Sequence, residues 1–279
     1  MGCAFKKLFS KEKDFGLPVI SIGNLTIGGN GKTPITMAIA KLTTKPAIVL
    51  RGYGRKSFGL VVVRNCNEIL ADVNISGDEA MEYALSLPDS IVIVSEDRSI
   101  GIKKAKELGA HIVLLDDGFS KFGIKKYDIL LEPAVLPLNP FCLPAGPYRC
   151  PFFMKTFADL ILKEDEHFKR AVEIENPTGK MLLVTSISKP SRLDPFLPDG
   201  VVDKLYFKDH DYFDKTIIDE AYRNSGATSL LVTNKDAVKL QNYSYNLSLI
   251  KLSIEFNSNV IKTIKSLDGI KLALFESER

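Results

Sequence analysis

The sequence is poor in the residues that build metal centres and disulfide frameworks. It has only four cysteines and three histidines in 279 residues. The cysteines form no CxxC pair and the histidines are far apart, which argues against a zinc site and predicts separate, reduced thiols. The cysteines are Cys3, Cys66, Cys142 and Cys150, and the histidines are His111, His167 and His210.

Long hydrophobic runs are also missing. No stretch approaches the roughly 20 apolar residues needed to cross a bilayer, and lysines at positions 6, 7, 11 and 13 interrupt any signal-peptide pattern. We therefore expect a cytoplasmic protein. Residues 3–9 mix basic with apolar side chains, as short interfacial anchors do. Taken alone, this segment is more simply explained as a frayed terminus.

The sequence has no large excess of charge of one sign. Its formal net charge of +3 is too slight to indicate nucleic-acid binding. Hydrophobic residues make up 45% and charged residues 25%, an ordinary globular composition that gives no sign of disorder. The length suits one large domain or two medium ones.

Short β-rich runs alternate with helical patterns along the chain, as in an α/β fold with a mostly parallel sheet. Most of the runs are continuously apolar, which is expected of strands covered on both faces. The expected strands are residues 18–22, 47–50, 91–94, 112–115, 128–131 and 159–162, with a further one at 59–64. The expected helices are residues 33–43, 78–87 and 99–108.

A turn cluster at residues 175–179, Glu-Asn-Pro-Thr-Gly, marks the best domain boundary. After it the pattern restarts, with strands at 181–185, 204–207 and 229–233 and a helix at 214–224. We expect a first domain of residues 1–177 and a smaller C-terminal α/β lobe of residues 178–279. The last helix, residues 258–267, fits either domain.

The strongest local signal is a glycine-rich loop between a strand and a helix, which reads Gly-Asn-Leu-Thr-Ile-Gly-Gly-Asn-Gly-Lys-Thr-Pro from Gly23 to Pro34. Glycines let backbone N–H groups curl around phosphate oxygens, and the helix N-terminus adds positive potential. Lys32 can reach the β- and γ-phosphates, and the Thr33 hydroxyl can ligate Mg²⁺. Thr26 stands where the phosphate-loop motif usually begins with glycine. The expected ATP-binding residues are Thr26, Gly28, Gly29, Asn30, Gly31, Lys32 and Thr33.

Two adjacent carboxylates, Asp116 and Asp117, end the apolar run that begins at residue 112. At the C-terminal edge of a parallel sheet they would lie beside the phosphate loop and hold Mg²⁺, directly or through water. A solvated acidic turn is the alternative. The two motifs together predict a P-loop NTPase-like, mostly parallel sheet flanked by helices, with a smaller second α/β lobe.

The phosphate loop resembles that of the tetraacyldisaccharide 4′-kinases, the lipid A 4′-kinases of Gram-negative bacteria. Further pieces follow in the family's order, and together the matches span about residues 18–240. Each piece is weak alone, but their order and combination are specific. They are Arg51-Gly52-Tyr53-Gly54-Arg55, Gly77-Asp78-Glu79, Glu96-Asp97-Arg98, Asp116-Asp117-Gly118-Phe119, Leu143-Pro144-Ala145-Gly146-Pro147, Asp209-His210 and Lys235-Asp236.

The resemblance implies a bilobed enzyme with its active site between the lobes. Such an enzyme uses ATP and Mg²⁺ to phosphorylate the 4′-hydroxyl of a tetraacylated glucosamine disaccharide 1-phosphate, which yields the lipid A precursor lipid IVA. Its substrate is a lipid-linked disaccharide, which implies that the protein binds peripherally to the cytoplasmic face of the bacterial inner membrane. The resemblance also implies a monomer.

The resemblance also implies roles for single residues. Asp78 takes the proton from the sugar hydroxyl, His210 supports it, and Lys32 acts on the phosphate. The implied metal ligands are Thr33, Asp116, Asp117 and Glu79, and the implied substrate contacts are Arg51, Arg55 and Arg149. Without the family, Asp78 fits a plain helix N-cap, Glu79 an exposed carboxylate, and residues 51–56 a solvated basic loop.

The sequence departs from the family at several positions. Ser120-Lys121 stands where Gln-His is usual, Tyr127 replaces an arginine, and Cys150 replaces the acidic residue after Arg149. Roles at these divergent positions are therefore not carried over. The N-terminal segment is also shorter than the family's amphipathic lead-in, so membrane docking is expected to be weaker or to use other surfaces.

Two other classes of P-loop protein compete with this reading. A Min/Par-type ATPase switch carries a signature lysine just before the Gly-Gly pair, and that position is Ile27 here. A GTPase carries Asn-Lys-x-Asp after a strand, whereas Asn234-Lys235-Asp236 lacks the intervening residue. The kinase reading remains the stronger prediction, with the ATPase switch as its alternative.

Overall fold

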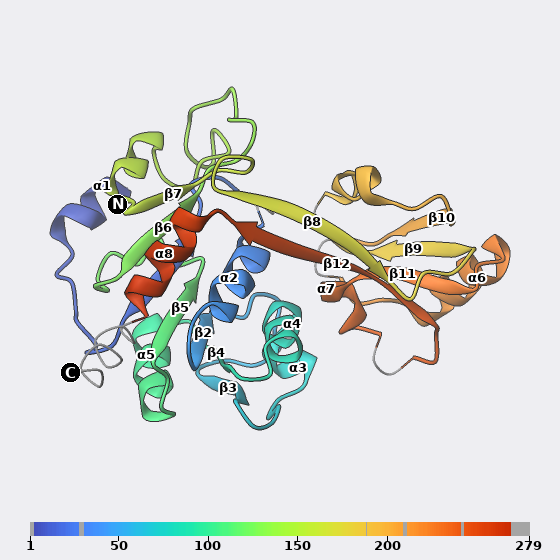
Figure 1. Cartoon of the computed structure of the whole chain (residues 1–279), viewed down its shortest axis with the longest axis horizontal. Helices are drawn as coiled ribbons and strands as arrows, with labels where there is room; N and C mark the ends of the chain where they lie inside the picture. The colour runs from blue at the N-terminus through green and yellow to red at the C-terminus, as the bar shows by residue number, and fades with distance from the viewer. Residues whose placement is uncertain (1–2, 28–30, 188, 209–210, 241–242, 269–279) are drawn as a thin grey trace.

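The computed structural model describes residues 3–27, 31–187, 189–208, 211–240 and 243–268. These residues form two lobes, each built around one β-sheet (Figure 1). The strand order is β3-β4-β2-β5-β1-β6-β7 in the first sheet and β10-β9-β11-β12-β8 in the second. The prediction of an α/β fold with mostly parallel sheets is confirmed.

Every neighbouring pair of strands in the first sheet is parallel except β3 and β4. The central strands are buried along their whole length, which explains their continuous apolar sequences. The strands are β1 (Val19–Gly23), β2 (Pro46–Leu50), β3 (Val61–Asn65), β4 (Ile91–Val94), β5 (Ile112–Asp116), β6 (Tyr127–Leu131) and β7 (Leu160–Leu162).

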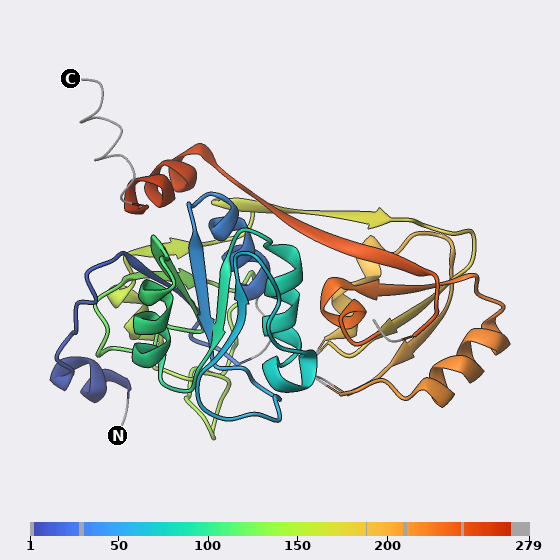
Figure 2. The same ribbon diagram turned by 90° about the horizontal axis from the view of Figure 1, so that it is seen from below.

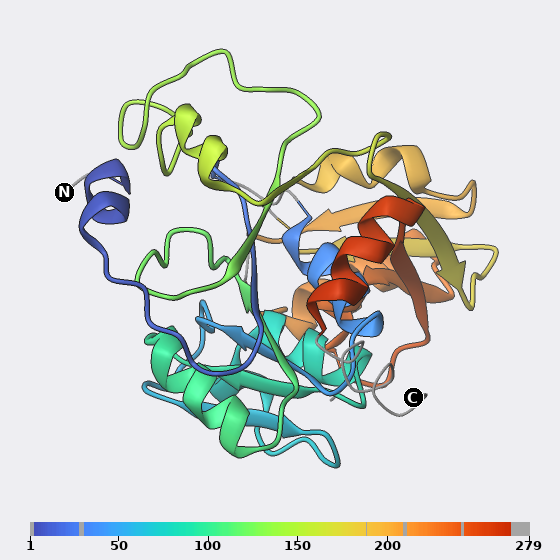
Figure 3. The same ribbon diagram turned by 60° about the vertical axis from the view of Figure 1, so that its left-hand side comes forward.

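Helices cover both faces of this sheet (Figure 3). Ile35 and Ile39 of α2 pack in the core of one face together with Val260 and Ile264 of α8, and α5 packs on the other face. Helix α8 therefore returns to the first lobe. The helices are α1 (Cys3–Phe9), α2 (Lys32–Lys41), α3 (Val73–Ser76), α4 (Asp78–Ser86), α5 (Arg98–Glu107) and α8 (Ser258–Leu267), and a 3₁₀ helix spans Phe152–Phe157.

The second lobe is smaller and has its own core. Leu182, Leu230 and Ile218 are fully buried on one side of its sheet, where α6 packs. Its strands are β8 (Phe168–Glu175), β9 (Met181–Thr185), β10 (Val201–Tyr206), β11 (Ser229–Thr233) and β12 (Leu247–Phe256). Its helices are α6 (Lys215–Ser225) and α7 (Asn234–Ala237), with 3₁₀ turns at Pro190–Arg192 and Asp194–Phe196.

Strands β8 and β12 form a long antiparallel ribbon that joins the lobes (Figure 2). Their register runs from Phe168 opposite Phe256 to Glu175 opposite Leu249. Because β8 pairs in the second sheet although it precedes residue 177, the chain crosses between the lobes on both strands of this ribbon. The division at 177/178 stays a prediction.

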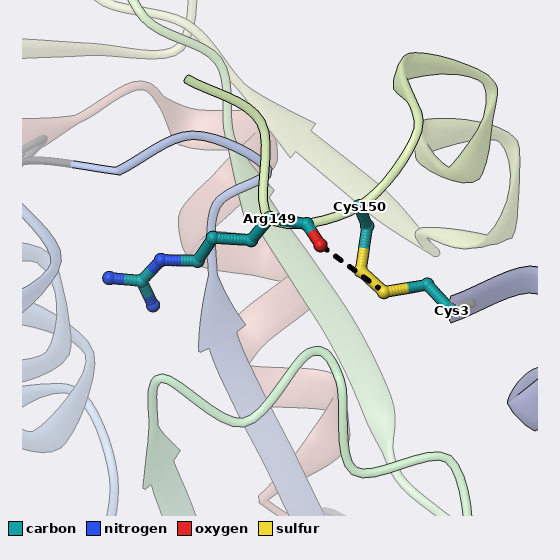
Figure 4. Close-up of a disulfide and its surroundings, with 3 residues drawn as sticks. All are labelled: Cys3, Arg149 and Cys150. Carbon is teal, nitrogen blue, oxygen red and sulfur yellow. Dashed lines mark hydrogen bonds between the residues drawn. A yellow bond between two sulfur atoms is a disulfide. The ribbon is translucent and has the colours of Figure 1, made fainter. Parts of the chain in front are cut away.

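A disulfide joins Cys3 of α1 to Cys150, 147 residues apart in sequence (Figure 4). The expectation that all four thiols are reduced is therefore wrong, because pairing depends on tertiary neighbours that spacing along the chain does not reveal. Cys66 and Cys142 are free. The Cys3 sulfur also lies 3.5 Å from the carbonyl oxygen of Arg149, so α1 is fixed beside that residue.

Helix α1 has seven residues, and no helix in the described parts of the chain is long and apolar enough to cross a membrane. Its apolar side chains Phe5, Leu8 and Phe9 are nonetheless exposed. An exposed apolar face on a basic helix is typical of an interfacial segment.

The disulfide predicts the number of reactive thiols. Protein purified without reductant and then unfolded should show two reactive thiols, and four after reduction. Cys3→Ser should show three thiols both before and after reduction, because Cys150 loses its partner. Cys66→Ser is the matched control, with one thiol before reduction. Titration of the unfolded proteins with a thiol reagent measures these numbers, and four thiols in the unreduced wild type would contradict the pairing.

Candidate active site

The parallel pairing of β1 and β5 gathers the two sequence motifs at one edge of the first sheet. Ile22 is in register with Asp116, so the phosphate loop that follows β1 begins beside the acidic pair that ends β5. This is the carboxyl edge of the strands, where open α/β sheets bind ligands.

The described part of the phosphate loop ends at Gly31, which caps helix α2. Gly31 has φ of 80°, a left-handed conformation that favours glycine. It also lies so close to Arg170 of β8 that a Cβ there would come within 2.8 Å of the guanidinium. Gly28, Gly29 and Asn30 lie outside the described residues. Thr26 is buried and bridges to the backbone of Tyr148.

Lys32 begins α2 and points toward the acidic pair. Its ammonium donates to Asn24 Oδ1 at 3.2 Å and lies 3.6 Å from Asp117 Oδ1. Thr33 follows it in the first turn of α2, partly exposed. The structure therefore brings together the predicted phosphate lysine and the predicted metal-binding carboxylates.

Asp116 and Asp117 differ in environment. Asp116 is 5% exposed; Tyr83 donates to its Oδ2 at 2.8 Å, whereas Oδ1 has no hydrogen-bond partner among the described residues. Burial raises the pKa of Asp116 against the opposing effects of Lys32 and Tyr83. Asp117 is more exposed and pairs with Arg149. Burial alone would raise the pKa of Asp117, but the cations Lys32 and Arg149 hold it below its usual range.

The unpartnered oxygen of Asp116 fits a divalent cation. A buried carboxylate oxygen without a donor needs an explanation, and Mg²⁺ is commonly held by one or two carboxylates together with substrate phosphates. The described residues contain no group of three or more His, Cys, Asp or Glu side chains that could hold a metal by themselves. The donor set therefore fits a metal that binds together with nucleotide.

Arg98 is a site residue to which the sequence analysis gave no role. It is 4% exposed, and it donates to the carbonyl oxygen of Ser95 at 2.6 Å and to that of Asp116 at 3.4 Å. Burial lowers the pKa of this guanidinium, and Asp116 and Asp117 oppose that effect. Arg98 thus links the end of β4 to the backbone of the acidic pair through these two hydrogen bonds.

Asp78 lies apart from the phosphate loop, at the junction of the lobes. It begins α4, is 6% exposed, and its Oδ1 accepts from the Glu79 N–H at 2.9 Å. Its Oδ2 lies 3.6 Å from Lys235 Nζ and 3.5 Å from Lys239 Nζ, both from the second lobe. Glu79 beside it is half-buried.

A small pocket surrounds Asp78 and takes its walls from both lobes. Its lining residues are Tyr53, Gly54, Val73, Gly77, Asp78, Tyr212 and Lys239. Lys56 lies over the Tyr212 ring, 5.2 Å from its centroid, which adds a second contact across the junction. His210, the predicted partner of Asp78, lies outside the described residues.

The three predicted substrate arginines occupy different surroundings. Arg51 is exposed after β2, and Arg149 pairs with Asp117 at the phosphate loop. The Arg55 side chain is buried, paired with Glu96, and donates to the Gly59 carbonyl oxygen at 2.6 Å. Its contacts are those of a residue that braces its own loop, and its role in substrate binding remains a prediction.

Comparison with known proteins finds one family throughout. Residues 2–194 match the family model described as tetraacyldisaccharide-1-P 4′-kinase. A tetraacyldisaccharide 4′-kinase of Helicobacter pylori is 49% identical over 259 residues, which are 93% of this chain and 83% of that protein. One from Campylobacter jejuni is 48% identical over 260 residues, 92% of this chain and 83% of that protein.

A solved structure is similar over almost the whole chain. It is the crystal structure of LpxK from Aquifex aeolicus in complex with ATP, with a TM-score of 0.77 and 27% sequence identity. The similarity covers 94% of this chain and 91% of that one. The two-lobed arrangement described above is thus found in a protein whose structure contains ATP.

Glu82, one turn after Asp78 in α4, is a titratable group that the sequence analysis did not single out. Burial raises the pKa of Glu82 to about 8, although Lys235 opposes the shift. In the folded protein this carboxyl therefore stays largely neutral at neutral pH.

Glu82 should make stability depend on pH. Its folded pKa of about 8 lies above its ordinary value of 4.5. Its contribution to the free energy of unfolding is therefore fully present below about pH 4.5 and is lost as the pH rises toward 8. Glu82→Gln removes the charge and should stabilise the fold by about 1–3 kcal/mol at about pH 9, with no difference near pH 4. Thermal unfolding across this range measures the effect.

Glu68→Gln is the matched control for this measurement, because Glu68 is exposed. It should follow the wild type at every pH. Identical pH profiles for Glu82→Gln and the wild type would show that the Glu82 carboxyl titrates normally.

Proposed function

This chain belongs to the tetraacyldisaccharide 4′-kinase family, and on that premise we propose that it transfers the γ-phosphate of ATP to the 4′-hydroxyl of tetraacyldisaccharide 1-phosphate. The product is the bisphosphorylated lipid A precursor, lipid IVA. The observation that carries the proposal is the meeting of Lys32, Asp116 and Asp117 at the carboxyl edge of the sheet. The family match does not favour a Min/Par-type ATPase switch.

The nucleotide end of the reaction belongs to the first lobe. The left-handed turn at Gly31 and the N-terminus of α2 supply backbone N–H groups for phosphate oxygens. The Lys32 ammonium neutralises phosphate charge. Asp116 and Thr33 are the residues we propose to hold Mg²⁺, with Asp117 beside them. When bound there, Mg²⁺ supplies positive charge to the β- and γ-phosphate oxygens.

Asp117 also contacts two basic side chains at the proposed site of phosphoryl transfer. It pairs with Arg149 and lies 3.6 Å from the Lys32 ammonium. An anionic phosphate competes with the carboxylate for both cations, so Lys32 and Arg149 are already directed toward the charge that develops during transfer. This supports a phosphoryl-stabilising role for Arg149.

The acceptor end lies at the junction of the lobes. We assign Asp78 as the base that takes the proton of the 4′-hydroxyl. The hydroxyl oxygen bonds to the γ-phosphorus, the bond to the bridging β–γ oxygen breaks, and ADP leaves with that electron pair. Tyr53 and Tyr212 line the pocket around Asp78, where aromatic side chains can pack against a sugar.

We further propose that the protein docks peripherally, as a monomer, on the cytoplasmic face of the inner membrane. The basic helix α1 exposes Phe5, Leu8 and Phe9, with Leu8 at 76% exposure. Val135 and Leu138, in the loop that leads toward Cys150, are also exposed. Apolar side chains beside lysines suit an anionic lipid surface, where an acylated substrate resides.

The direct test is transfer of radiolabel from γ-labelled ATP to tetraacyldisaccharide 1-phosphate in mixed detergent micelles, with and without Mg²⁺. We expect a labelled bisphosphorylated lipid only when Mg²⁺ is present. ATP hydrolysis that rises with protein concentration, without any lipid product, would contradict the kinase and favour the ATPase switch.

Asp78→Asn should separate chemistry from nucleotide binding. The amide cannot take the hydroxyl proton, so kcat should fall by about 10²–10⁴-fold while the KM for ATP changes less than about twofold. Steady-state kinetics with the lipid substrate measure both. Asp72→Asn is the matched control, because Asp72 caps the neighbouring helix α3 and asparagine caps equally well. Normal turnover of Asp78→Asn would remove Asp78 from the mechanism.

A further inference from the structure

Two lysines of the second lobe approach the carboxylate of Asp78 in the first. Lys235 lies in α7 and Lys239 follows one turn later, and both ammonium groups are within 3.6 Å of Asp78 Oδ2. This is a contact between lobes at the residue that we assign as the base. Of the two lysines, Lys239 is the more enclosed, with its side chain 3% exposed against 16% for Lys235.

The ammonium of Lys239 is held rigidly by its own lobe. It donates to Ser186 Oγ at 2.7 Å and to the carbonyl oxygen of Asp211 at 2.9 Å. A lysine ammonium has three N–H donors. Two are used within the second lobe, and the third has Asp78 Oδ2, 3.5 Å away, as its acceptor.

Ser186, which accepts from Lys239, is itself held by hydrogen bonds to a buried carboxylate. Ser186 donates from its hydroxyl to Asp236 Oδ1 at 2.8 Å and from its backbone N–H to the same oxygen at 3.1 Å. Asp236 is completely buried and also accepts from Thr185 Oγ1 at 2.7 Å. A buried carboxylate satisfied by several donors holds its neighbours in one arrangement. The position of the Lys239 ammonium is therefore set by the second lobe, independently of Asp78.

Acidic groups also lie near Asp78. Glu79 and Glu82 share helix α4 with Asp78, and the charge of Asp236 in α7 acts on Glu82. Glu82 is largely neutral because burial raises its pKa, and Asp236 is engaged by its own donors. Among the described residues, Lys235 and the fixed Lys239 bring positive charge to Asp78 from the second lobe.

We propose that Lys239 is a positioning residue that orients the Asp78 carboxylate toward the acceptor hydroxyl across the lobe junction. The inference rests on the proposed role of Asp78 as the base. The Glu79 N–H holds one carboxylate oxygen and Lys239 directs the other, so the plane of the carboxylate is set by contacts from both lobes. Separating the lobes withdraws Lys239 and removes its part in orienting the carboxylate.

Lys239→Met tests the inference, because methionine keeps most of the length and removes the charge. We expect kcat for lipid phosphorylation to fall by about 10–100-fold while the KM for ATP changes less than about twofold. Lys239→Arg keeps a cation and should stay within about tenfold of the wild type. Lys215→Met is the matched control, since Lys215 is an exposed lysine of the same lobe that pairs with Asp219, and it should have wild-type kinetics.

A double-mutant comparison separates positioning from a purely structural effect. If Lys239 acts through Asp78, adding Lys239→Met to Asp78→Asn should change the residual rate by less than about twofold. If Lys239→Met lowers the rate of Asp78→Asn by about a further 10–100-fold, the inference is overturned, because Lys239 would then act independently of Asp78. ATP binding and thermal unfolding of each variant report whether it is folded. If the methionine variant is not folded, Lys239→Gln, which also removes the charge, replaces it with the same expected fall in kcat.

The outcomes also separate this inference from the proposed function. A wild-type protein that makes no labelled lipid refutes the proposed function itself. A wild type that makes the lipid, with Lys239→Met as active as Lys215→Met, overturns only the role of Lys239.

Discussion

The candidate site depends on the parallel register of β1 and β5. This register places Asp116 opposite Ile22. The acidic pair therefore lies beside the loop that carries Lys32. A shift of one residue would turn the Asp116 side chain to the other face of the sheet. The surroundings hold this arrangement, because Tyr83 donates to Asp116 and Arg98 holds its backbone oxygen.

The proposed site is divided between the lobes according to the two halves of the proposed reaction. The phosphate loop and acidic pair are first-lobe features, with Arg170 of the ribbon against Gly31. The pocket proposed for the acceptor combines Asp78 with side chains of the second lobe. Chemistry between the two substrates thus requires that the lobes meet, as in other kinases that close around their ligands.

The sequence predicted those parts that are continuous along the chain. The phosphate loop and the pair Asp116–Asp117 each follow an apolar strand, so strand, loop and helix could be read in order. Strands β8 and β12 were not predicted, because polar and apolar residues are mixed along them and they lack the continuous apolar runs of the first sheet. The contact of Asp78 with Lys239 and the Cys3–Cys150 disulfide join residues more than 140 positions apart, which a single sequence does not reveal.

The return of α8 to the first lobe has a consequence for biosynthesis. Val260 and Ile264 fill part of the core that also contains Ile35 and Ile39, near the start of the chain. A ribosome therefore has to release the chain beyond residue 264 before the phosphate-binding lobe can close its core. The second lobe, made from a continuous segment inside the first, can fold earlier, although domains usually fold in order from the N-terminus. In this protein the lobe that begins first is completed last.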